Sequence, residues 1–350
     1  MSLVVFDDSD QERMRKVAKK YSKKPEEKTE EVDDNVEDVA ELSKDAKGGS
    51  ELVYHRIKER VDPELWNHFQ IILSRVRKLE DKPKILWFQD TAQDPEVQFL
   101  KDDKEKAKFV RFIFPSDWSL EKYNMYLGIP YEGSVVLKNA IVPIPDHKKP
   151  TKEDGKIRLI YFSTPHRGLD VLCMALSVLN RKRDDFEVDI YSSLKIYGWE
   201  ERDKDFEKLY DALREMPNVK YHGSVSNDEI REALTKTHVM AYPNTYQETG
   251  CCTAIEAMSA GCVVVCPNWG VLPETCANFA WMYGMVHDKE EHARKHAYVL
   301  NEALDSYWKE EIQMGLDFQS RYYNTFYDVD VVSKQWEMML MALREKYPNK

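Results

Sequence analysis

The residues best suited to chemistry lie in residues 246–267, which read YQETGCCTAIEAMSAGCVVVCP. Residues 252–260 are rich in helix formers and residues 262–266 are apolar and mostly β-branched. The pattern therefore predicts a loop, a short helix and a strand, with Gly261 at the end of the helix. The unpaired N–H groups at the start of such a helix attract anions, and phosphates above all.

The chemistry around the helix start indicates a nucleotide-sugar. Backbone N–H groups of Gly250, Cys251 and Cys252 are expected to point outward, and Gly250 would let a diphosphate come close. Glu248 on the loop and Glu256 inside the helix bracket this position, and carboxylates accept hydrogen bonds from the hydroxyl groups that sugars supply. A structural alternative stays open, because a Glu near a helix start complements the helix dipole and AIEAM is an ordinary buried-face pattern.

The same residues carry a resemblance to a known family. Glu248 and Glu256 match the E-x(7)-E motif of retaining GT-B glycosyltransferases, notably glycosyltransferase family 4 (group 1), and the match extends through EAMSAGCVVV to GVLPE. The resemblance implies that Glu248 contacts the donor sugar and that Glu256 holds the ribose hydroxyls. In GVLPE, Glu274 is expected to cap the helix after Gly270. The donor-binding set on this segment is Glu256, Thr249, Gly250, Cys251 and Cys252.

A cation follows the first strand of the second half. Residues 157–162 read as a strand, and Arg167 lies beyond it at the start of a helix. A cation there is unfavourable unless an anion joins it, and a guanidinium can grip a diphosphate with paired hydrogen bonds. The alternative is a surface Arg that reaches solvent. Arg167-Gly168 looks like the Lys-Gly element of the family, in which an Arg usually precedes the Lys and both stabilise the diphosphate. That earlier Arg has no counterpart here, and Ser163 stands near its expected position. The resemblance also assigns the pocket for the base to residues 191–199.

The first half carries a glycine loop and a carboxylate. Gly48-Gly49 precedes an expected helix and resembles the family's GGxE loop on the acceptor side of the cleft; a plain turn is the alternative. Asp90 follows a strand at residues 84–88, at the edge where open α/β sheets bind ligands. It is a candidate to bind or polarise an acceptor hydroxyl, or else to cap the next helix. The family often has His at the preceding position, which is Gln89 here.

Composition favours a soluble protein with a sizeable core. The 350 residues carry a formal net charge of −11 and a pI near 5.5, which argues against a general nucleic-acid binder. No apolar run approaches the roughly 20 residues of a membrane span, and no signal-peptide pattern opens the sequence. The six cysteines show no CxxC spacing, so we expect reduced core cysteines in a cytoplasmic protein.

From residue 156 the βα alternation predicts a doubly wound parallel sheet in an α/β protein. The resemblance extends this to the GT-B fold, with two Rossmann-like domains facing a cleft and a short N-terminal one. The expected parts are a charged extension of low packing potential (1–46), an acceptor-side domain (47–145), a nucleotide-sugar domain (146–330) and a helix that crosses back to the first domain (331–350).

Three local expectations complete the organisation. Residues 1–6 are expected to form a strand, and residues 63–79 a single helix. Asp8-Ser9-Asp10 has the D-x-D spacing of metal-dependent transferases, but no nucleotide-binding βαβ unit stands before it in this sequence, so we expect no metal site there.

The resemblance implies a retaining transferase that moves a hexose from a nucleoside-diphosphate sugar to a hydroxyl of a glycan or another sugar-bearing acceptor. It needs neither a metal nor another cofactor, and the catalytic roles fall on Glu248, Arg167 and Asp90. The oligomeric state is left open. The alternatives are a phosphorylase or epimerase on the same fold, and a catalytically inactive nucleotide-sugar-binding or scaffold protein. A dehydrogenase is disfavoured because no GxGxxG follows a strand.

Overall fold

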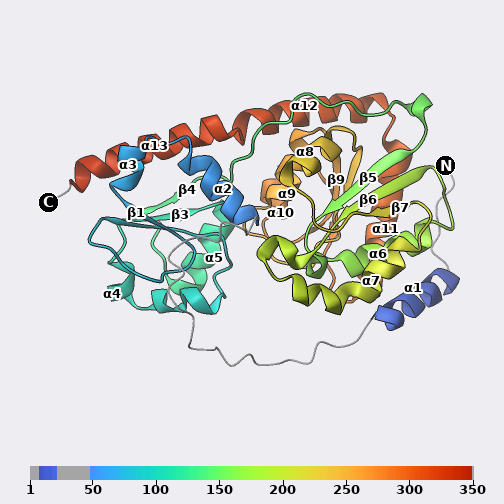
Figure 1. Cartoon of the computed structure of the whole chain (residues 1–350), viewed down its shortest axis with the longest axis horizontal. Helices are drawn as coiled ribbons and strands as arrows, with labels where there is room; N and C mark the ends of the chain where they lie inside the picture. The colour runs from blue at the N-terminus through green and yellow to red at the C-terminus, as the bar shows by residue number, and fades with distance from the viewer. Residues whose placement is uncertain (1–7, 22–47, 349–350) are drawn as a thin grey trace.

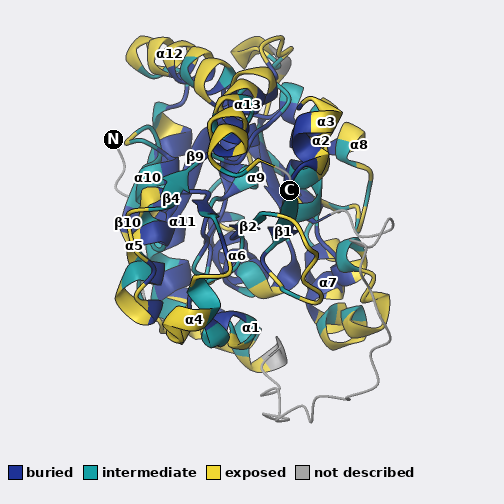
Figure 2. Cartoon of the chain, turned by 90° about the vertical axis from the view of Figure 1, so that its left-hand side faces the viewer, coloured by how far each residue is buried: buried dark blue, intermediate teal, exposed yellow. Residues whose placement is uncertain are grey.

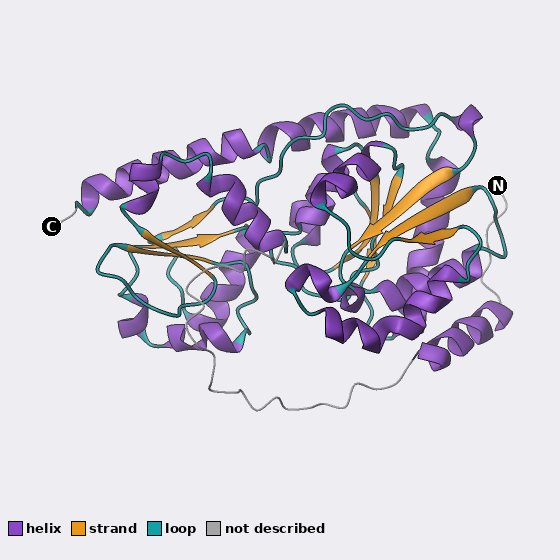
Figure 3. Cartoon of the chain, in the orientation of Figure 1, coloured by secondary structure: helices purple, strands orange, loops and turns teal. Residues whose placement is uncertain are grey.

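Two parallel β-sheets organise the chain (Figure 1). The computed structural model describes residues 8–21 and 48–348, so the strand expected at residues 1–6 and the charged segment 22–46 lie outside the described residues. Helices cover both faces of each sheet, and the two sheets lie side by side (Figure 3). The predicted α/β class with two Rossmann-like domains is confirmed.

The first sheet has the order β1-β2-β3-β4, and all its neighbouring strands are parallel. Its central strands are short apolar runs, as expected of parallel strands that are buried on both faces. The strands are β1 (Gln70–Leu73), β2 (Lys84–Trp87), β3 (Arg111–Phe114) and β4 (Ser134–Val136). The helices are α2 (Gly49–Lys58), α3 (Pro63–Asn67), α4 (Asp103–Lys106) and α5 (Asp117–Leu127).

The helix predicted over residues 63–79 is wrong beyond its first turn. It starts as expected, because Asp62 accepts a hydrogen bond from the Leu65 N–H and proline occupies the first helical position. It ends at Asn67, and the sequence QIIL then forms β1, which pairs with β2. Its β-branched isoleucines suit a strand at the edge of the sheet, so tertiary pairing overrides the local helical pattern.

The second sheet has the order β10-β9-β8-β5-β6-β7, and all its neighbouring strands are parallel. This is the doubly wound arrangement, in which the strand order reverses between β5 and β8. The strands are β5 (Ile157–Phe162), β6 (Phe186–Tyr191), β7 (Val219–Tyr221), β8 (Val239–Ala241), β9 (Val263–Asn268) and β10 (Trp281–Gly284). The helices are α6 (Leu169–Leu179), α7 (Glu207–Arg214), α8 (Asn227–Thr235), α9 (Cys252–Ser259), α10 (Leu272–Thr275) and α11 (Lys289–Ser306).

Two long helices at the end of the chain connect the domains. α12 (Glu310–Phe326) packs on α9, and α13 (Val329–Lys346) packs on α2 and α3, so the pair runs along both domains at the top of Figure 1. Trp336 of α13 is fully buried, and its ring centroid lies 4.5 Å from that of Trp87 and 5.6 Å from that of Trp66. The last helix therefore supplies part of the core of the first domain.

The N-terminal helix α1 (Asp8–Tyr21) packs on α6 and α11 of the second domain. Met14 is 1% exposed and joins the core of that domain. Asp10 is also 1% exposed and pairs with Lys182 at 2.6 Å and with Arg181 at 3.3 Å. The low packing potential expected for residues 1–46 is therefore wrong for this helix, because one buried methionine and one buried ion-pair network fix it to the domain surface.

The apolar core is divided between the domains. The second domain has one large cluster of buried residues, and the first has two, one on each face of its sheet. Figure 2 shows the buried strands at the centre and the exposed residues on the outer helix faces. Within residues 8–21 and 48–348, no helix combines the length and the apolar character that a membrane crossing requires.

Candidate functional site

The helix α9 forms as predicted and holds the centre of the site. It ends in a Schellman motif, in which Gly261 has a φ of +67° and its N–H donates to the Met258 carbonyl, while the Cys262 N–H donates to the Ala257 carbonyl. Only glycine adopts this left-handed conformation without strain. The motif turns the chain directly into β9, which fixes the opposite end of the helix, with Cys251 as its N-cap, toward the first domain.

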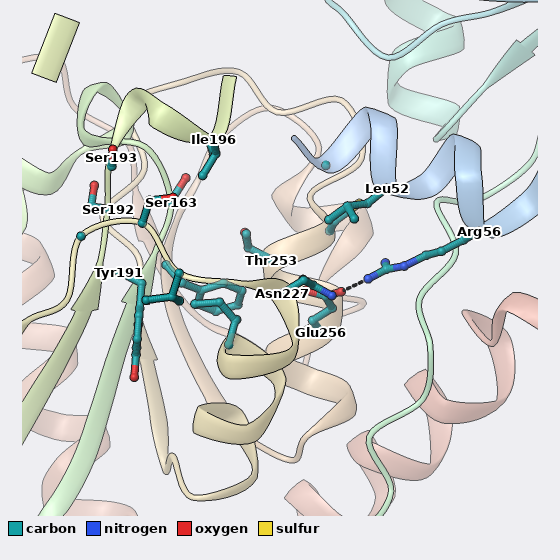
Figure 4. Close-up of a pocket in the computed structure, with 17 residues that line it drawn as sticks. Leu52, Arg56, Ser163, Tyr191, Ser192, Ser193, Ile196, Asn227, Thr253 and Glu256 are labelled. Atoms are coloured by element: carbon teal, nitrogen blue, oxygen red, sulfur yellow. Dashed lines mark hydrogen bonds and ion pairs between the residues drawn. The ribbon is translucent and has the colours of Figure 1, made fainter. Parts of the chain in front are cut away.

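A cavity of about 130 Å³ lies between the start of α9 and the first domain (Figure 4). Cys252, Thr253 and Glu256 of α9 line it, together with residues at the C-terminal ends of β5 and β6 and the loop 223–227. Helix α2 closes the opposite wall. This is the position at which doubly wound sheets bind ligands, beyond the carboxyl ends of their strands.

Glu256 is buried in the cavity wall and paired across the domain interface. Its side chain is 6% exposed, and its Oε1 accepts a hydrogen bond from Arg56 Nη2 at 2.7 Å. Arg56 belongs to α2, and its Nη1 also donates to the Ala140 carbonyl at 3.2 Å. The carboxylate that the sequence assigns to ribose is thus held by one oxygen, and a hydroxyl group in the cavity would approach the other.

Glu248 and Arg167, both predicted to be catalytic, form an ion pair with each other. Arg167 Nη1 donates to Glu248 Oε1, which also accepts from the hydroxyl of Tyr242 at 2.7 Å. The Arg167 guanidinium lies over the Tyr246 ring, 4.6 Å from its centroid. Burial lowers the pKa of Arg167, but the charge of Glu248, the nearby tyrosines Tyr242 and Tyr197 and the hydrogen bond to Glu248 together outweigh it and hold that pKa above its ordinary value. Glu248 is the anion that accommodates a cation at this strand end.

The first domain clamps the loop that carries Glu248. The Thr249 hydroxyl donates to the Gln89 carbonyl at 2.6 Å, and the Ser116 hydroxyl donates to the Thr249 carbonyl at 2.7 Å. Asn139 Nδ2 donates to the Gly250 carbonyl at 2.7 Å. A Cβ atom on Gly250 would lie 2.7 Å from this nitrogen, so the glycine allows close approach of the first domain. That packing is one reason for the glycine, and its predicted role in admitting a diphosphate stays a prediction.

Asp90 lies past the end of β2, as predicted, but does not cap the next helix. That cap is Asp94, which accepts from the Glu96 N–H at 2.8 Å. Burial raises the pKa of the Asp90 carboxyl, and the nearby charge of Arg75 opposes this. The side-chain amide of Gln89, in the place of the family's histidine, exchanges two hydrogen bonds with Asn139 at 2.9 and 3.0 Å.

Ser163 and one of the predicted glycines, Gly49, line the cavity. Gly49 lines it, and a Cβ there would face Cys252 at 3.9 Å, so the Gly48-Gly49 loop meets the start of α9. Ser163 lines the cavity from the end of β5. Gly168 has a φ of +104°, and a Cβ there would lie 2.0 Å from the Pro243 carbonyl oxygen, so no side chain fits.

Sequence reasoning missed one residue of the site and misplaced another. Arg56 was not identified, although Gly49, Leu52 and Arg56 stand at i, i+3 and i+7 and therefore share one helix face. The cap expected of Glu274 on its own helix is wrong. Glu274 accepts from the backbone N–H groups of Asp117 and Trp118 at 3.0 and 2.8 Å, so it caps α5 in the first domain.

Comparison with known proteins connects this geometry to a family. Residues 144–313, which include β5 to β10 and α9, match the family model described as Glycosyl transferases group 1. A search of curated proteins returns no match.

Three solved structures share the fold. A glycosyltransferase from Rickettsia africae ESF-5 has a TM-score of 0.59 at 15% identity, with 89% of this chain and 85% of that chain covered. Anabaena Alr3699/HepE in complex with UDP-glucose has a TM-score of 0.58 at 16% identity, covering 75% and 72%. A sucrose-phosphate synthase from Thermosynechococcus elongatus has a TM-score of 0.56 at 14% identity, covering 76% and 69%. The chain therefore has the GT-B fold of glycosyltransferases, and its residues 144–313 match the group 1 family.

Proposed function

We propose that the chain is a glycosyltransferase that moves a hexose from a nucleoside-diphosphate sugar to a hydroxyl of a carbohydrate acceptor, with retention at the anomeric carbon. The observation that carries the proposal is the cavity in which the start of α9, the Glu256 carboxylate and the ends of β5 and β6 meet. The match of residues 144–313 to glycosyl transferases group 1 supports it. The Anabaena protein with the same fold was solved with UDP-glucose bound.

Different walls of the cavity would contact different parts of the donor. The ribose hydroxyls would donate to Glu256, and the base would lie toward Tyr191 and Ser193 at the end of β6. The diphosphate would approach the start of α9, where the helix dipole favours negative charge and the Thr253 hydroxyl lines the cavity. Arg167 would contribute a second positive group from the end of β5.

The transfer step that we propose uses these positions. The bond between the anomeric carbon and the diphosphate oxygen breaks while the acceptor oxygen attacks from the same face, and the acceptor proton passes to the departing phosphate. Arg167 and the start of α9 stabilise the negative charge that develops, and each such fixed group contributes about 10²–10³ in rate. Glu248 orients Arg167 and receives a sugar hydroxyl, and Asp90 orients the acceptor.

A donor panel tests this proposal. In a thermal-shift screen with UDP-, GDP-, ADP- and CMP-sugars, one class of nucleotide should raise the melting temperature, because a ligand that binds only the folded state stabilises it. The same donor should then lose its sugar to an acceptor in a transfer assay. A chain whose melting temperature none of the donors raises would contradict the proposal.

One observation favours a second candidate, a catalytically inactive nucleotide-sugar-binding or scaffold protein. Gln89 occupies the place of the family's histidine, and its amide is tied to Asn139, so it offers no acid or base. Hydrolysis and transfer assays separate the two candidates. Donor binding without turnover, for every acceptor tried, would favour the inactive protein.

We also propose that transfer needs no divalent metal. The start of α9 and Arg167 supply the positive charge beside the diphosphate that a cation supplies in other transferases. Activity should therefore survive EDTA at a concentration that strips Mn²⁺ and Mg²⁺. Loss of activity on chelation, with recovery when either ion is returned, would overturn this part of the proposal.

A further inference from the structure

Arg56 reaches out of the first domain into the wall of the nucleotide cavity. Figure 4 shows its side chain extending from α2 to Glu256. Arg56 is 8% exposed and Glu256 is 5% exposed, and their Nη2 and Oε1 atoms lie 2.7 Å apart. The second terminal nitrogen of Arg56 donates to the Ala140 carbonyl at 3.2 Å, so the guanidinium itself is held in one orientation.

Stability alone is a weak explanation for such a pair. Removing both charges from water costs about as much as their attraction returns, so a buried ion pair is often no more stable than an apolar pair of equal size. The same domain interface already contains hydrogen bonds that Ser116 and Asn139 donate and one that Glu274 accepts, and none of them needs a buried cation. The position of Arg56 in the cavity wall points instead to the ligand.

We infer that Arg56 is a positioning residue, which orients the Glu256 carboxylate so that it recognises the ribose hydroxyls of the nucleotide. This inference rests on the proposed function. A carboxylate held through one oxygen presents the other in a fixed direction, and a hydroxyl group that donates to it needs that direction. Without Arg56 the side chain of Glu256 is free to rotate. The protein then no longer prefers a nucleotide with a ribose over one with a deoxyribose.

The inference assigns part of the nucleotide specificity to the first domain. Glu256 belongs to the domain that binds the donor, but the group that orients it comes from α2, 200 positions earlier in the chain. Recognition of the sugar hydroxyls is therefore complete only when α2 and α9 are in contact. The base and diphosphate contacts, which come from the second domain, do not need Arg56.

Calorimetry with matched nucleotides tests the inference. The probes are UDP, GDP, ADP and CDP, each compared with its 2′-deoxy form. For the nucleotide that binds, the wild type should prefer the ribose form by about 10-fold or more, because hydrogen bonds to charged groups are the strong ones. Arg56→Met should reduce this ratio to about 2-fold or less, while affinity for the deoxy form changes little. Arg56→Lys keeps the positive charge but loses the two fixed N–H groups of the guanidinium, and should give an intermediate ratio.

Two controls isolate the role of Arg56. Arg60 lies two residues beyond the end of α2, where it pairs with the exposed Asp330 at 2.9 Å and donates to the backbone carbonyl of Arg56 at 3.2 Å, so Arg60→Ala removes a nearby charge but leaves the Arg56 guanidinium in place and should keep the wild-type ratio. In a Glu256→Gln variant the preference for the ribose form over the deoxy form should already be lost, and adding Arg56→Met should not change the affinity ratio further. This non-additivity is what a purely structural contact would not give.

The outcomes separate the inference from the proposed function. If Arg56→Met lowers the affinity for both forms equally, or leaves the ratio unchanged, Arg56 is only an interdomain contact and the inference fails. If Arg56→Met does not fold, Arg56→Lys decides alone, and a wild-type ratio there overturns the inference. If the wild type binds none of the four nucleotides, it is the proposed function that fails.

Discussion

Each acidic residue of the E-x(7)-E motif lies against an arginine. Glu248 pairs with Arg167 and Glu256 pairs with Arg56. The sequence identified the two glutamates and Arg167 as a set but not the pairing, because the partners are 81 and 200 positions apart and no local spacing records such contacts. The anion that Arg167 meets in the structure is a protein carboxylate, and its predicted contact with a diphosphate stays a prediction. The donor roles of all four residues remain predictions.

Asp90 offers a test of function against stability. Burial raises the pKa of its carboxyl, so the folded chain binds a proton there more readily than the unfolded chain does. The unfolding free energy contributed by this group therefore falls as pH rises above the ordinary carboxyl value near 4. Asp90→Asn removes this half-buried charge, and we expect the variant to unfold at a higher temperature than the wild type at pH 7.

The gain in stability should disappear below about pH 4, where the wild-type carboxyl is protonated in both states. Transfer to the acceptor should fall by about 100-fold, because a positioned acid–base group contributes 10²–10⁴ in rate. Thermal unfolding between pH 3 and 8 and a transfer assay check both parts. A variant that is less stable at pH 7 would show that Asp90 is a structural hydrogen-bonding group.

At the scale of elements, the second domain was the easier to predict. Its strands and helices alternate with clear apolar runs, and α9 and β9 form where the sequence indicates. The first domain has strands of three or four residues, which are too short to show a periodicity. Helix α1 was underestimated for a different reason, since its attachment depends on a few apolar residues, Met14, Val17 and Ala18, and on two charged ones, Asp10 and Arg15, among many charged residues.

The turn after β5 should tolerate only glycine at position 168. Its φ of +104° and the Pro243 carbonyl, 2.0 Å from a Cβ position, both exclude a side chain. Gly168→Ala should lower the free energy of unfolding by more than about 3 kcal/mol, because backbone strain and a collision combine. Gly155 is the matched control, with a φ of +114° and no atom within 4 Å of a Cβ. Gly155→Ala should cost only the strain, about 1–2 kcal/mol. Equal losses in urea unfolding would contradict the collision.

For the whole molecule, the domain interface organises the site. Gln89, Ser116 and Asn139 of the first domain hold the loop of Glu248, and Arg56 holds Glu256. The sequence placed Gln89 after a strand of the first domain, but it did not identify Arg56 or show which residues make contacts between the domains. Glu274 shows this most clearly. It was expected to cap its own helix but caps α5 of the other domain, and the sequence pattern of a cap is the same in both cases.

Removing that cap should loosen the two domains. Glu274→Ala should lower the free energy of unfolding by about 1 kcal/mol, the usual value of a helix cap. It should also increase proteolysis in residues 142–155, the linker between β4 of the first domain and β5 of the second. Ser226→Ala removes the capping box of α8, within the second domain, and serves as the control. It should cost a similar free energy and leave the linker protected. Equal cleavage of both variants would show that Glu274 stabilises α5 alone.

The two ends of the chain are attached to the opposite domains: α1 packs on the second, and α13 completes the core of the first. During synthesis the ribosome delivers β1 to β4 long before α13, so one face of the first sheet stays uncovered until α13 has been translated. Cleavage in the linker would give an N-terminal fragment that lacks α13 and a C-terminal fragment that lacks α1. Only when both fragments are present together can either one close its core.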